Sequence, residues 1–468
     1  MSEPQAAGGE LSRAAGHGRR AAPVRLVHLG LGNFYRAHQA WYTERAPDAG
    51  DWGYAAFTGR RAELADALNA QGGLYTLITR AADGDRFDLL SSISRAHAGA
   101  DHEAWLRYLA SPDVRTVTIT VTEAGYLRGP EGGLDRDRDQ VQADVEALRK
   151  DLTAPVGTAP ARLVAGCAAR RQGDGGPLTV VSCDNLPGNG AVVARVVREL
   201  AELVDPGLAD WIAGSVSYVT TMVDRITPRT TPEDVQTVAE ATGLHDSSPV
   251  GTEPFSEWVL SGRFPGGRPG WEDAGATFTD DIEPYEHRKL WLLNGGHSLL
   301  AYAGSILGHQ TVAEAVADQT CSGWLEEWWA EASRYLSLPE ADVAAYRGAL
   351  LDRFANPRMH HRLAQIAADG SQKLPIRILP TLRRERTAGR LPSGAARVLA
   401  AWVCHLRGAG ASVNDARADQ VVPLADGPLS QAVPRVLAAL DPALADDGEL
   451  VAAVVADAER LGSATPDG

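Results

Sequence analysis

Cysteine is scarce in this sequence, and the few cysteines stand far apart. The four of them, Cys167, Cys183, Cys321 and Cys404, form no Cys-x-x-Cys pair in 468 residues. This spacing excludes a disulfide-stapled scaffold and offers none of the paired ligands of a structural zinc site. We therefore expect no metal, and a reducing cytoplasm as the setting.

Long hydrophobic runs and positive charge are lacking as well. No run of about 18 apolar residues occurs, so we expect no membrane-spanning helix. Acidic residues number 60 against 45 basic ones, which leaves a net charge of −15. This balance argues against nucleic acid or an anionic membrane as a partner and favours a small-molecule substrate.

The pattern along the chain predicts two domains. Residues 1–22 are rich in alanine, glycine and arginine without the apolar core of a signal peptide, so we expect a disordered tail. Strands and helices then alternate as far as a Gly/Pro-rich stretch at 261–270, and the pattern after about 280 is almost wholly helical. We predict an α/β fold, with a Rossmann-type doubly wound domain over 23–280 and a mostly α-helical domain over 281–468.

A strand that runs into a glycine turn opens the first domain. The buried strand expected at 24–29 leads into Gly30-Leu31-Gly32, and a helix is expected to begin near Asn33. This order lets backbone N–H groups hold a phosphate. Alone, the two-glycine turn is a weak signal, because Tyr35 stands where a third glycine is usual.

The end of the second strand, expected at 53–58, meets the adenosine ribose in this architecture. NAD-binding proteins usually carry an acidic residue there, but Arg60 and Arg61 follow this strand and Glu63 is the nearest acid. Because a planar guanidinium suits a 2′-phosphate, we predict that both arginines bind the cofactor. The alternative is that both are solvated at the start of a helix.

Runs of β-branched and apolar residues predict further strands at 116–122, 178–183 and 216–222, and a surface hairpin at 85–95. Asn185 follows one of these strands, and Asp224 follows another. Ligands of doubly wound sheets bind beyond the carboxyl ends of the strands, so both residues are candidates. The alternatives are a simple turn at 184–190 and a surface ion pair between Asp224 and Arg225.

Residues 286–302 place several polar groups on an otherwise apolar helix. Glu286 and Lys289 share a face, and on an α-helix Asn294 lies about 140° round from Lys289, with His297 between them. A desolvated lysine has a lowered pKa and can act as a general base without a metal. In the alternative, Lys289 reaches solvent, Asn294 caps a break at Gly295-Gly296, and His297 is a core histidine.

Several strings, KLWLLNGGHS, GLGNFYRAHQ, SCDNLPGNG, VDRITP and DGSQKLP, resemble the long-chain polyol dehydrogenases, the mannitol dehydrogenase family. The resemblance covers nearly the whole chain after residue 22. It implies a monomer that transfers hydride between NAD or NADP and a secondary alcohol of an open-chain sugar derivative.

The resemblance also implies roles for individual residues. They are the general base for Lys289, alkoxide stabilisation for Asn185 and Asn294, hydroxyl orientation for His297, proton passage for Glu286, substrate contact for Asp224 and Lys373, and cofactor contact for Gly30, Leu31, Gly32, Asn33, Phe34 and Arg36.

The substrate stays open between three pairs. D-mannitol with D-fructose leads on family frequency, followed by D-mannonate with D-fructuronate and by mannitol 1-phosphate with fructose 6-phosphate. Polyol-oxidising members tend to carry arginine where Gln365 stands, which favours the uronate. An anionic substrate needs a cationic partner, and the candidates are Arg225, Arg288, Arg362, Lys373 and Arg377. A dinucleotide sensor without catalysis is the non-enzymatic alternative.

Overall fold

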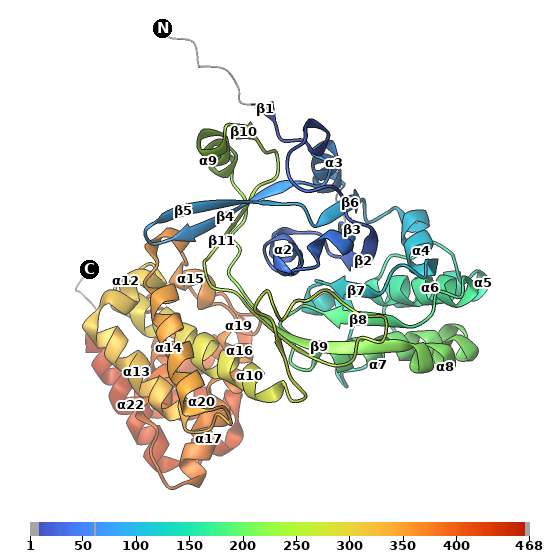
Figure 1. The fold of residues 1–468 in the computed structure, drawn as a ribbon. Coiled ribbons are helices and arrows are strands. Elements are labelled where there is room, and N and C mark those ends of the chain that lie inside the picture. Colours follow the sequence, from blue (N-terminus) through green and yellow to red (C-terminus); the bar gives the residue numbers. More distant parts are fainter. Residues whose placement is uncertain (1–8, 60–61, 464–468) are drawn as a thin grey trace. The chain divides into compact units, whose positions relative to one another are not determined.

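The computed structural model describes residues 9–59 and 62–463, and the chain forms two compact units, 1–282 and 283–468 (Figure 1). The division falls at 282, against the 280 expected from the sequence. Arg60 and Arg61 lie outside the described residues.

An eight-stranded sheet is the centre of the first unit. In spatial order its strands are β13 (Thr277–Phe278), β12 (Glu257–Ser261), β9 (Val216–Asp224), β8 (Leu178–Ser182), β7 (Thr116–Ile119), β2 (Val24–Leu29), β3 (Gly53–Phe57) and β6 (Ile93–His97). All neighbouring strands from β9 to β6 are parallel, and β12 pairs antiparallel with β9. Numbered along the chain, the six parallel strands stand in the order 3-2-1-4-5-6, the arrangement of dinucleotide-binding folds. The predicted Rossmann-type domain is confirmed.

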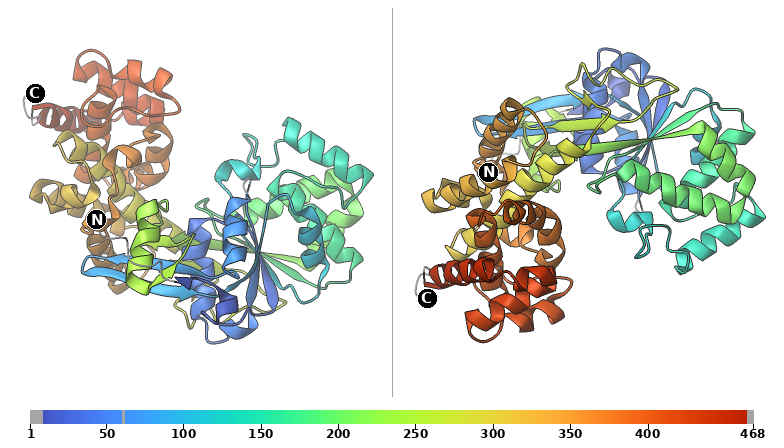
Figure 2. Two further views of the ribbon diagram at one scale, coloured as in Figure 1. Left: turned by 90° about the horizontal axis from the view of Figure 1, so that it is seen from above. Right: turned by 90° about the horizontal axis from the view of Figure 1, so that it is seen from below.

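Apolar strands covered by helices explain this sheet. Every residue of β7 and β8 is buried, as in parallel sheets that are covered on both faces. One core contains residues from the helices α4 (His102–Ala110), α5 (Asp139–Lys150), α6 (Ala159–Gln172), α7 (Asn189–Val204) and α8 (Pro206–Ser215). The other core contains residues from α1 (Asn33–Ala37), α2 (Gln39–Arg45) and α3 (Glu63–Ala70). Figure 2 shows the helices on both sides of the sheet.

The hairpin expected at 85–95 is divided between two sheets, so this prediction is wrong in its bounds. β5 (Gly84–Leu90) pairs with β4 (Tyr75–Ala81) and, through it, with β11 (Val250–Thr252). Residues Ile93–His97 instead form β6, at the edge of the main sheet. Edge strands carry polar residues where central strands do not, and for that reason β6 looked like part of an exposed hairpin.

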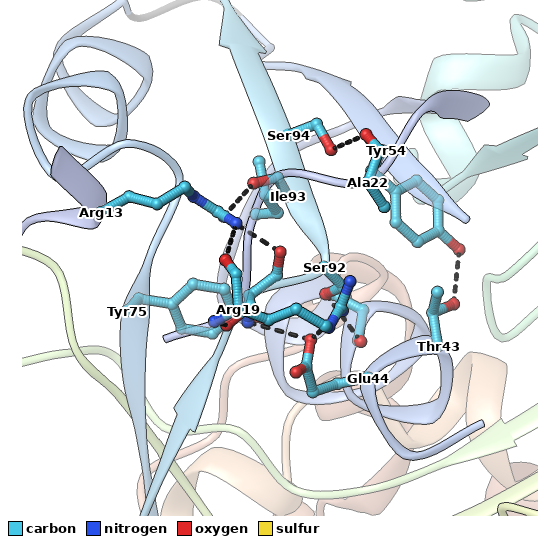
Figure 3. A network of polar contacts seen from close by, with 12 residues as sticks. Arg13, Arg19, Ala22, Thr43, Glu44, Tyr54, Tyr75, Ser92, Ile93 and Ser94 are labelled. Atoms are coloured by element: carbon cyan, nitrogen blue, oxygen red, sulfur yellow. Dashed lines mark hydrogen bonds and ion pairs between the residues drawn. The ribbon is translucent and has the colours of Figure 1, made fainter. Parts of the chain in front are cut away.

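The expected disordered tail over 1–22 is wrong for residues 9–22, which are held in place by hydrogen bonds (Figure 3). The guanidinium of Arg13 donates to the carbonyl oxygens of Gly72 at 2.7 Å and of Ser91 and Ile93 at 3.0 Å each. Composition alone cannot show such an anchor, because these carbonyls belong to residues about 60 to 80 positions away along the chain.

Two further contacts fix the same segment. β1 (Gly9–Glu10) pairs in parallel with β10 (Leu244–His245), and Arg19 forms an ion pair with Glu44 at 2.9 Å (Figure 3). The first unit also contains the helix α9 (Pro232–Thr242) and three short 3-10 helices, η1 (Arg13–Ala15), η2 (Ala49–Asp51) and η3 (Glu123–Tyr126).

The second unit is helical, as predicted. Its helices are α10 (Glu283–Arg288), η4 (Lys289–Asn294), α11 (Gly295–Leu299), η5 (Leu300–Gly304), α12 (Val312–Ala317), α13 (Gln319–Ser333), α14 (Glu340–Phe354), η6 (Pro357–Met359), α15 (Leu363–Ile366), α16 (Gly370–Arg377), α17 (Leu379–Thr387), α18 (Ser393–Leu406), α19 (Ala418–Val421), η7 (Val422–Ala425), α20 (Leu429–Leu440), α21 (Pro442–Ala445) and α22 (Gly448–Ser463). The almost wholly buried α18 forms the middle of the core. Among the described residues, no helix combines the length and the apolar character that crossing a membrane requires.

Candidate active site

The turn after β2 depends on its first glycine. Gly30 has φ +111°, and a Cβ there would lie 2.2 Å from the carbonyl oxygen of Thr120. The N–H groups of Gly30 and Leu31 donate to the carbonyl of Phe57 at 3.0 and 2.8 Å, and the hydroxyl of Thr120 donates to the carbonyl of Gly30 at 2.9 Å. The turn is therefore fixed between the carboxyl ends of β3 and β7, where only glycine fits.

Two residues predicted to contact the cofactor also form hydrogen bonds that hold this turn within the protein. Asn33 donates to the carbonyl of Pro228 and to Thr230 at 3.0 Å each. Arg36 is buried, and its guanidinium donates to Asn33 at 2.9 Å and to the carbonyl of Ser248. These contacts support the turn, and the cofactor contact predicted for Asn33 and Arg36 stays a prediction.

A cavity of about 490 Å³ opens beside the turn. It is lined by Phe34, Thr120, Val121, Thr122, Glu123, Ala124, Cys183, Asp184 and Asn185. These residues follow β2, β7 and β8, so the cavity lies at the carboxyl ends of the strands, where the strand order reverses between β2 and β7. Ligands of doubly wound folds bind at this point. Phe34 and Asn185 are thus placed at the expected ligand site.

The turn that carries Asn185 is organised by a residue that the sequence did not single out. The amide of Asn189 donates to the carbonyls of Asp184 and Thr221 at 3.2 and 2.9 Å and accepts from the N–H of Thr221 at 2.9 Å. A Cβ at Gly190 would lie 2.6 Å from the nitrogen of Thr220. The Asn-Gly pair lets α7 begin against β9, a tight contact that the sequence could not distinguish from an ordinary loop.

Asp224 ends β9 and is only 5% exposed, and its neighbour Arg225 is buried as well. The alternative of a surface ion pair is therefore wrong. The guanidinium of Arg225 donates to the carbonyl of Glu253 at 3.2 Å and lies 4.5 Å above the ring of Trp41. Because its contacts are with the first unit's own groups, we remove Arg225 from the candidates for binding an anionic substrate.

The polar helix of the second unit continues without a break, but it is not an α-helix throughout. The segment η4 from Lys289 to Asn294 is a π-helix, in which the N–H of Gly295 donates to the carbonyl of Leu290, five residues earlier. Asn294 and Gly295 both have helical φ and ψ angles, so the alternative of a capped break is wrong.

The π-helix changes the angular relation of the polar groups. An i→i+5 helix has more residues in each turn than an α-helix, so Lys289 and Asn294 come closer to one face than the separation of about 140° that they have on an α-helix. His297 follows Asn294 by three residues in α11 and shares its side of the helix. Glu286 is half-buried one turn before Lys289, in α10.

His297 is buried and uncharged. Its ring is stacked on Phe354 at 4.6 Å. Burial, and then the positive charges of His361, Arg353 and Arg377, hold the pKa of His297 well below its ordinary value. Within the described residues, its Nε2 atom is buried and has no hydrogen-bond partner. An unsatisfied buried nitrogen is uncommon in folded proteins, and a bound ligand or an ordered water would supply the missing partner.

Positive charge gathers around this histidine. Arg377 donates through one nitrogen to the carbonyl of Asn294 at 3.3 Å and to the hydroxyl of Ser298 at 3.1 Å, and its own Nε is buried without a partner among the described residues. Burial lowers the pKa of Arg377 to about 10. The pKa of Lys373 is lowered by burial and by Arg377. In the described part of the chain, no ion pair joins Arg377 to a carboxylate.

The remaining predicted cations differ in placement. Arg288 is buried, with its guanidinium 4.1 Å above the ring of Tyr346. Arg362 is the N-cap of the short helix α15 and Gln365 lies within that helix, and both side chains are exposed. Of the five candidates, Arg377 is therefore the one that contacts the helix of His297 directly, and Lys373 lies on the same helix α16 as Arg377.

One group of possible metal ligands occurs in the described residues, formed by His309, Asp318 and Cys321. Asp318 is the N-cap of α13, and one oxygen accepts from the N–H groups of Thr320 and Cys321 at 2.8 and 2.9 Å. Burial and the charge of Asp318 raise the pKa of the Cys321 thiol to about 12. Helix capping accounts for this group without an ion.

Comparison with known proteins covers both units. The mannitol dehydrogenase Rossmann domain family matches residues 24–273, and the mannitol dehydrogenase C-terminal domain family matches residues 281–462. The D-mannonate oxidoreductase of Escherichia coli (strain K12) is 38% identical over 394 residues, which are 82% of this chain and 80% of that protein.

Two solved structures have the same fold over nearly the full length. One is a D-sorbitol dehydrogenase in substrate-free form, with a TM-score of 0.87 and 30% identity over 95% of each chain. The other is a Pseudomonas fluorescens mannitol 2-dehydrogenase in a ternary complex with NAD and D-mannitol, with a TM-score of 0.77 and 32% identity over 95% of this chain and 94% of that one. The chain therefore belongs to the mannitol dehydrogenase family of oxidoreductases.

Proposed function

We propose that the protein transfers a hydride between a nicotinamide cofactor and a secondary alcohol or ketone of an open-chain sugar derivative, with Lys289 as the general base. The observation that carries this proposal is that Lys289 and Asn294 stand at the two ends of one π-helical segment. His297 follows in the same helix, and its Nε2 atom is buried without a partner among the described residues. The relative crystallised with NAD and D-mannitol supports the cofactor and the class of substrate.

Each polar group has a role in this proposal. Lys289 takes the hydroxyl proton during oxidation and returns it during reduction. Asn294 donates a hydrogen bond to the developing alkoxide, which stabilises its charge. A neutral His297 supplies a hydrogen bond that orients the same hydroxyl. Glu286 passes the proton to solvent.

The cofactor would bind beside the glycine turn. The left-handed Gly30 and the cavity at the switch point suit a dinucleotide, and Gly30, Leu31, Gly32 and Phe34 line the turn that would hold it. When bound, NAD or NADP supplies the hydride acceptor. The backbone N–H groups of the turn would donate hydrogen bonds to the phosphates of the cofactor.

The charge near His297 bears on which sugar derivative is oxidised. Family frequency favours D-mannitol with D-fructose. Arg353 and Arg377 instead place positive charge near His297, and the carboxylate of D-mannonate or D-fructuronate would complement it. The D-mannonate oxidoreductase relative agrees with this reading. We therefore propose the D-mannonate and D-fructuronate pair as the substrate, with D-mannitol and D-fructose as the second candidate.

Lys289→Ala tests the mechanism. We expect kcat to fall by about three orders of magnitude, because a positioned general base contributes roughly 10²–10⁴, while cofactor binding and the melting temperature stay close to those of the wild type. Lys150→Ala is the control, since Lys150 is exposed and only pairs with Glu146. A Lys289→Ala enzyme that keeps more than about a tenth of wild-type kcat would disprove the assignment.

A further inference from the structure

Two neighbouring tryptophans of α13 donate hydrogen bonds to backbone carbonyls of the π-helical segment η4. The indole nitrogen of Trp328 donates to the carbonyl of Trp291 at 2.9 Å, and that of Trp329 donates to the carbonyl of Leu292 at 2.9 Å. Both indoles are completely buried. Two adjacent donors on one helix thus bind two adjacent acceptors in the middle of η4.

The glycine pair after η4 makes this approach possible. A Cβ at Gly295 would lie 2.7 Å from the indole nitrogen of Trp328, and a Cβ at Gly296 would lie 3.1 Å from that of Trp329. The first distance is shorter than real Cβ contacts and the second is tighter than most of them, so a larger residue at either position would push an indole away from its carbonyl. The Gly-Gly pair in KLWLLNGGHS therefore serves close packing against α13, and the helix passes through it unbroken.

The two indole hydrogen bonds give two carbonyls of η4 donors outside the helix and thereby support its i→i+5 geometry. A π-helical turn is rare and occurs mostly at functional sites. It persists where the surroundings determine it. Without the indoles, the carbonyls of Trp291 and Leu292 would lose their external donors and could accept from N–H groups four residues on. In that α-helical register Asn294 would stand about 140° from Lys289.

We infer that Trp328 and Trp329 are positioning residues for the reaction, because their indole N–H groups hold the π-helical turn that brings Lys289 and Asn294 closer to one face. This inference rests on the proposed function, in which those two residues act on the same oxygen. The tryptophans do not touch the substrate in this scheme. They act through the carbonyls of the helix that carries the catalytic groups.

The test replaces each indole by a ring that cannot donate. Trp328→Phe and Trp329→Phe are compared with the control Trp105→Phe in the first unit. Trp105 is just as buried, and its indole donates to the carbonyl of Arg162 at 2.8 Å. The measured quantities are kcat, the KM of cofactor and substrate, the pH profile of kcat/KM, and the melting temperature.

We expect kcat to fall about tenfold or more in Trp328→Phe and Trp329→Phe, as for a displacement of catalytic groups by about 1 Å. The limb of the pH profile that reports the base should shift, and the KM of the cofactor should not change. Trp105→Phe should lower the melting temperature, with kcat and the pH profile as in the wild type. Wild-type kcat and an unshifted profile in both test variants would overturn the inference.

Gly295→Ala decides the question if the tryptophan variants do not fold. It keeps both indoles and inserts a methyl group against Trp328, so it should lower kcat and shift the pH profile in the same sense. Wild-type kcat in Gly295→Ala would then overturn the inference. Failure of the proposed function is recognised separately, by full activity of Lys289→Ala, whatever the tryptophan variants show.

Discussion

Arg377 is a buried cation close to the catalytic groups that we propose. Its guanidinium holds the carbonyl of Asn294 through one nitrogen, and a second nitrogen is buried without a partner in the described part of the chain. A buried cation that lacks a counter-ion is costly, and a substrate carboxylate would remove that cost. The residue therefore connects the position of Asn294 with the choice of substrate.

We predict that Arg377→Gln raises the KM for D-mannonate by about 100-fold, because the loss of one partner of a buried charge pair costs about 2–5 kcal/mol. The KM for D-mannitol should change much less, since that substrate has no carboxylate. Steady-state kinetics with D-mannonate, D-fructuronate, D-mannitol and D-fructose would measure both effects.

Arg362→Gln is the matched control for this change, because Arg362 is exposed in the same unit and its loss should leave all four substrates unaffected. Equal losses for D-mannonate and D-mannitol in Arg377→Gln would contradict the role in substrate choice. The arginine would then only support Asn294.

From the sequence, residues could be grouped into a candidate site where they lie within one short segment. Lys289, Asn294 and His297 could be found because they lie within nine positions of each other. The charges that hold His297 neutral could not, because Arg353, His361 and Arg377 reach it from other helices. Neither could the internal contacts of Arg36 and Asn33, which involve residues about 200 positions away.

At the scale of elements, the sequence predicted several helices and strands but not the places where the local geometry departs from a regular helix or strand. β7 and β8 followed from runs of β-branched residues. The π-helix did not, since apolar periodicity over a few residues cannot separate i→i+4 from i→i+5 bonding. The evidence for it lies in Trp328 and Trp329, more than 30 positions away along the chain.

The N-terminal segment is a second exception at this scale, and Arg13 is its main anchor. We predict that Arg13→Ala lowers the free energy of unfolding by about 2 kcal/mol, since hydrogen bonds from charged donors contribute about 1.5–3 kcal/mol each in favourable cases. The carbonyls of Gly72, Ser91 and Ile93 lose their shared donor in this variant. Unfolding in urea measures the effect.

Arg20→Ala is the control for this measurement, because Arg20 is exposed in the same segment and its loss should change the free energy of unfolding by less than about 0.5 kcal/mol. A change of that size in Arg13→Ala as well would show that the segment does not contribute to stability. The prediction would then fail.

At the scale of the whole molecule, alternation of strands and helices was enough to predict the doubly wound sheet, and the Gly/Pro-rich stretch at 261–270 preceded the division into units. The strand order then places the cavity at the reversal between β2 and β7. Topology rather than any single motif therefore locates the cofactor, and its ribose is expected near the end of β3.

Cofactor choice is the property of the whole enzyme for which we make the last prediction. The end of β3 is fixed: the N–H of Thr58 donates to the carbonyl of His97, and its hydroxyl accepts from the N–H of Gly99, both at 2.9 Å. Arg60 and Arg61 follow immediately, and Glu63, the nearest acid after this strand, is exposed at the start of α3.

Because arginine binds a 2′-phosphate through charge-assisted hydrogen bonds, we predict that NADP is used at least comparably to NAD. Arg60→Ala and Arg61→Ala should each raise the KM for NADP by about tenfold, the equivalent of about 1.4 kcal/mol, and leave the KM for NAD unchanged. Arg86→Ala, exposed on β5, is the control. A wild-type preference for NAD of more than about 100-fold, or 2.7 kcal/mol, that neither arginine variant alters would show that these side chains take no part in cofactor choice.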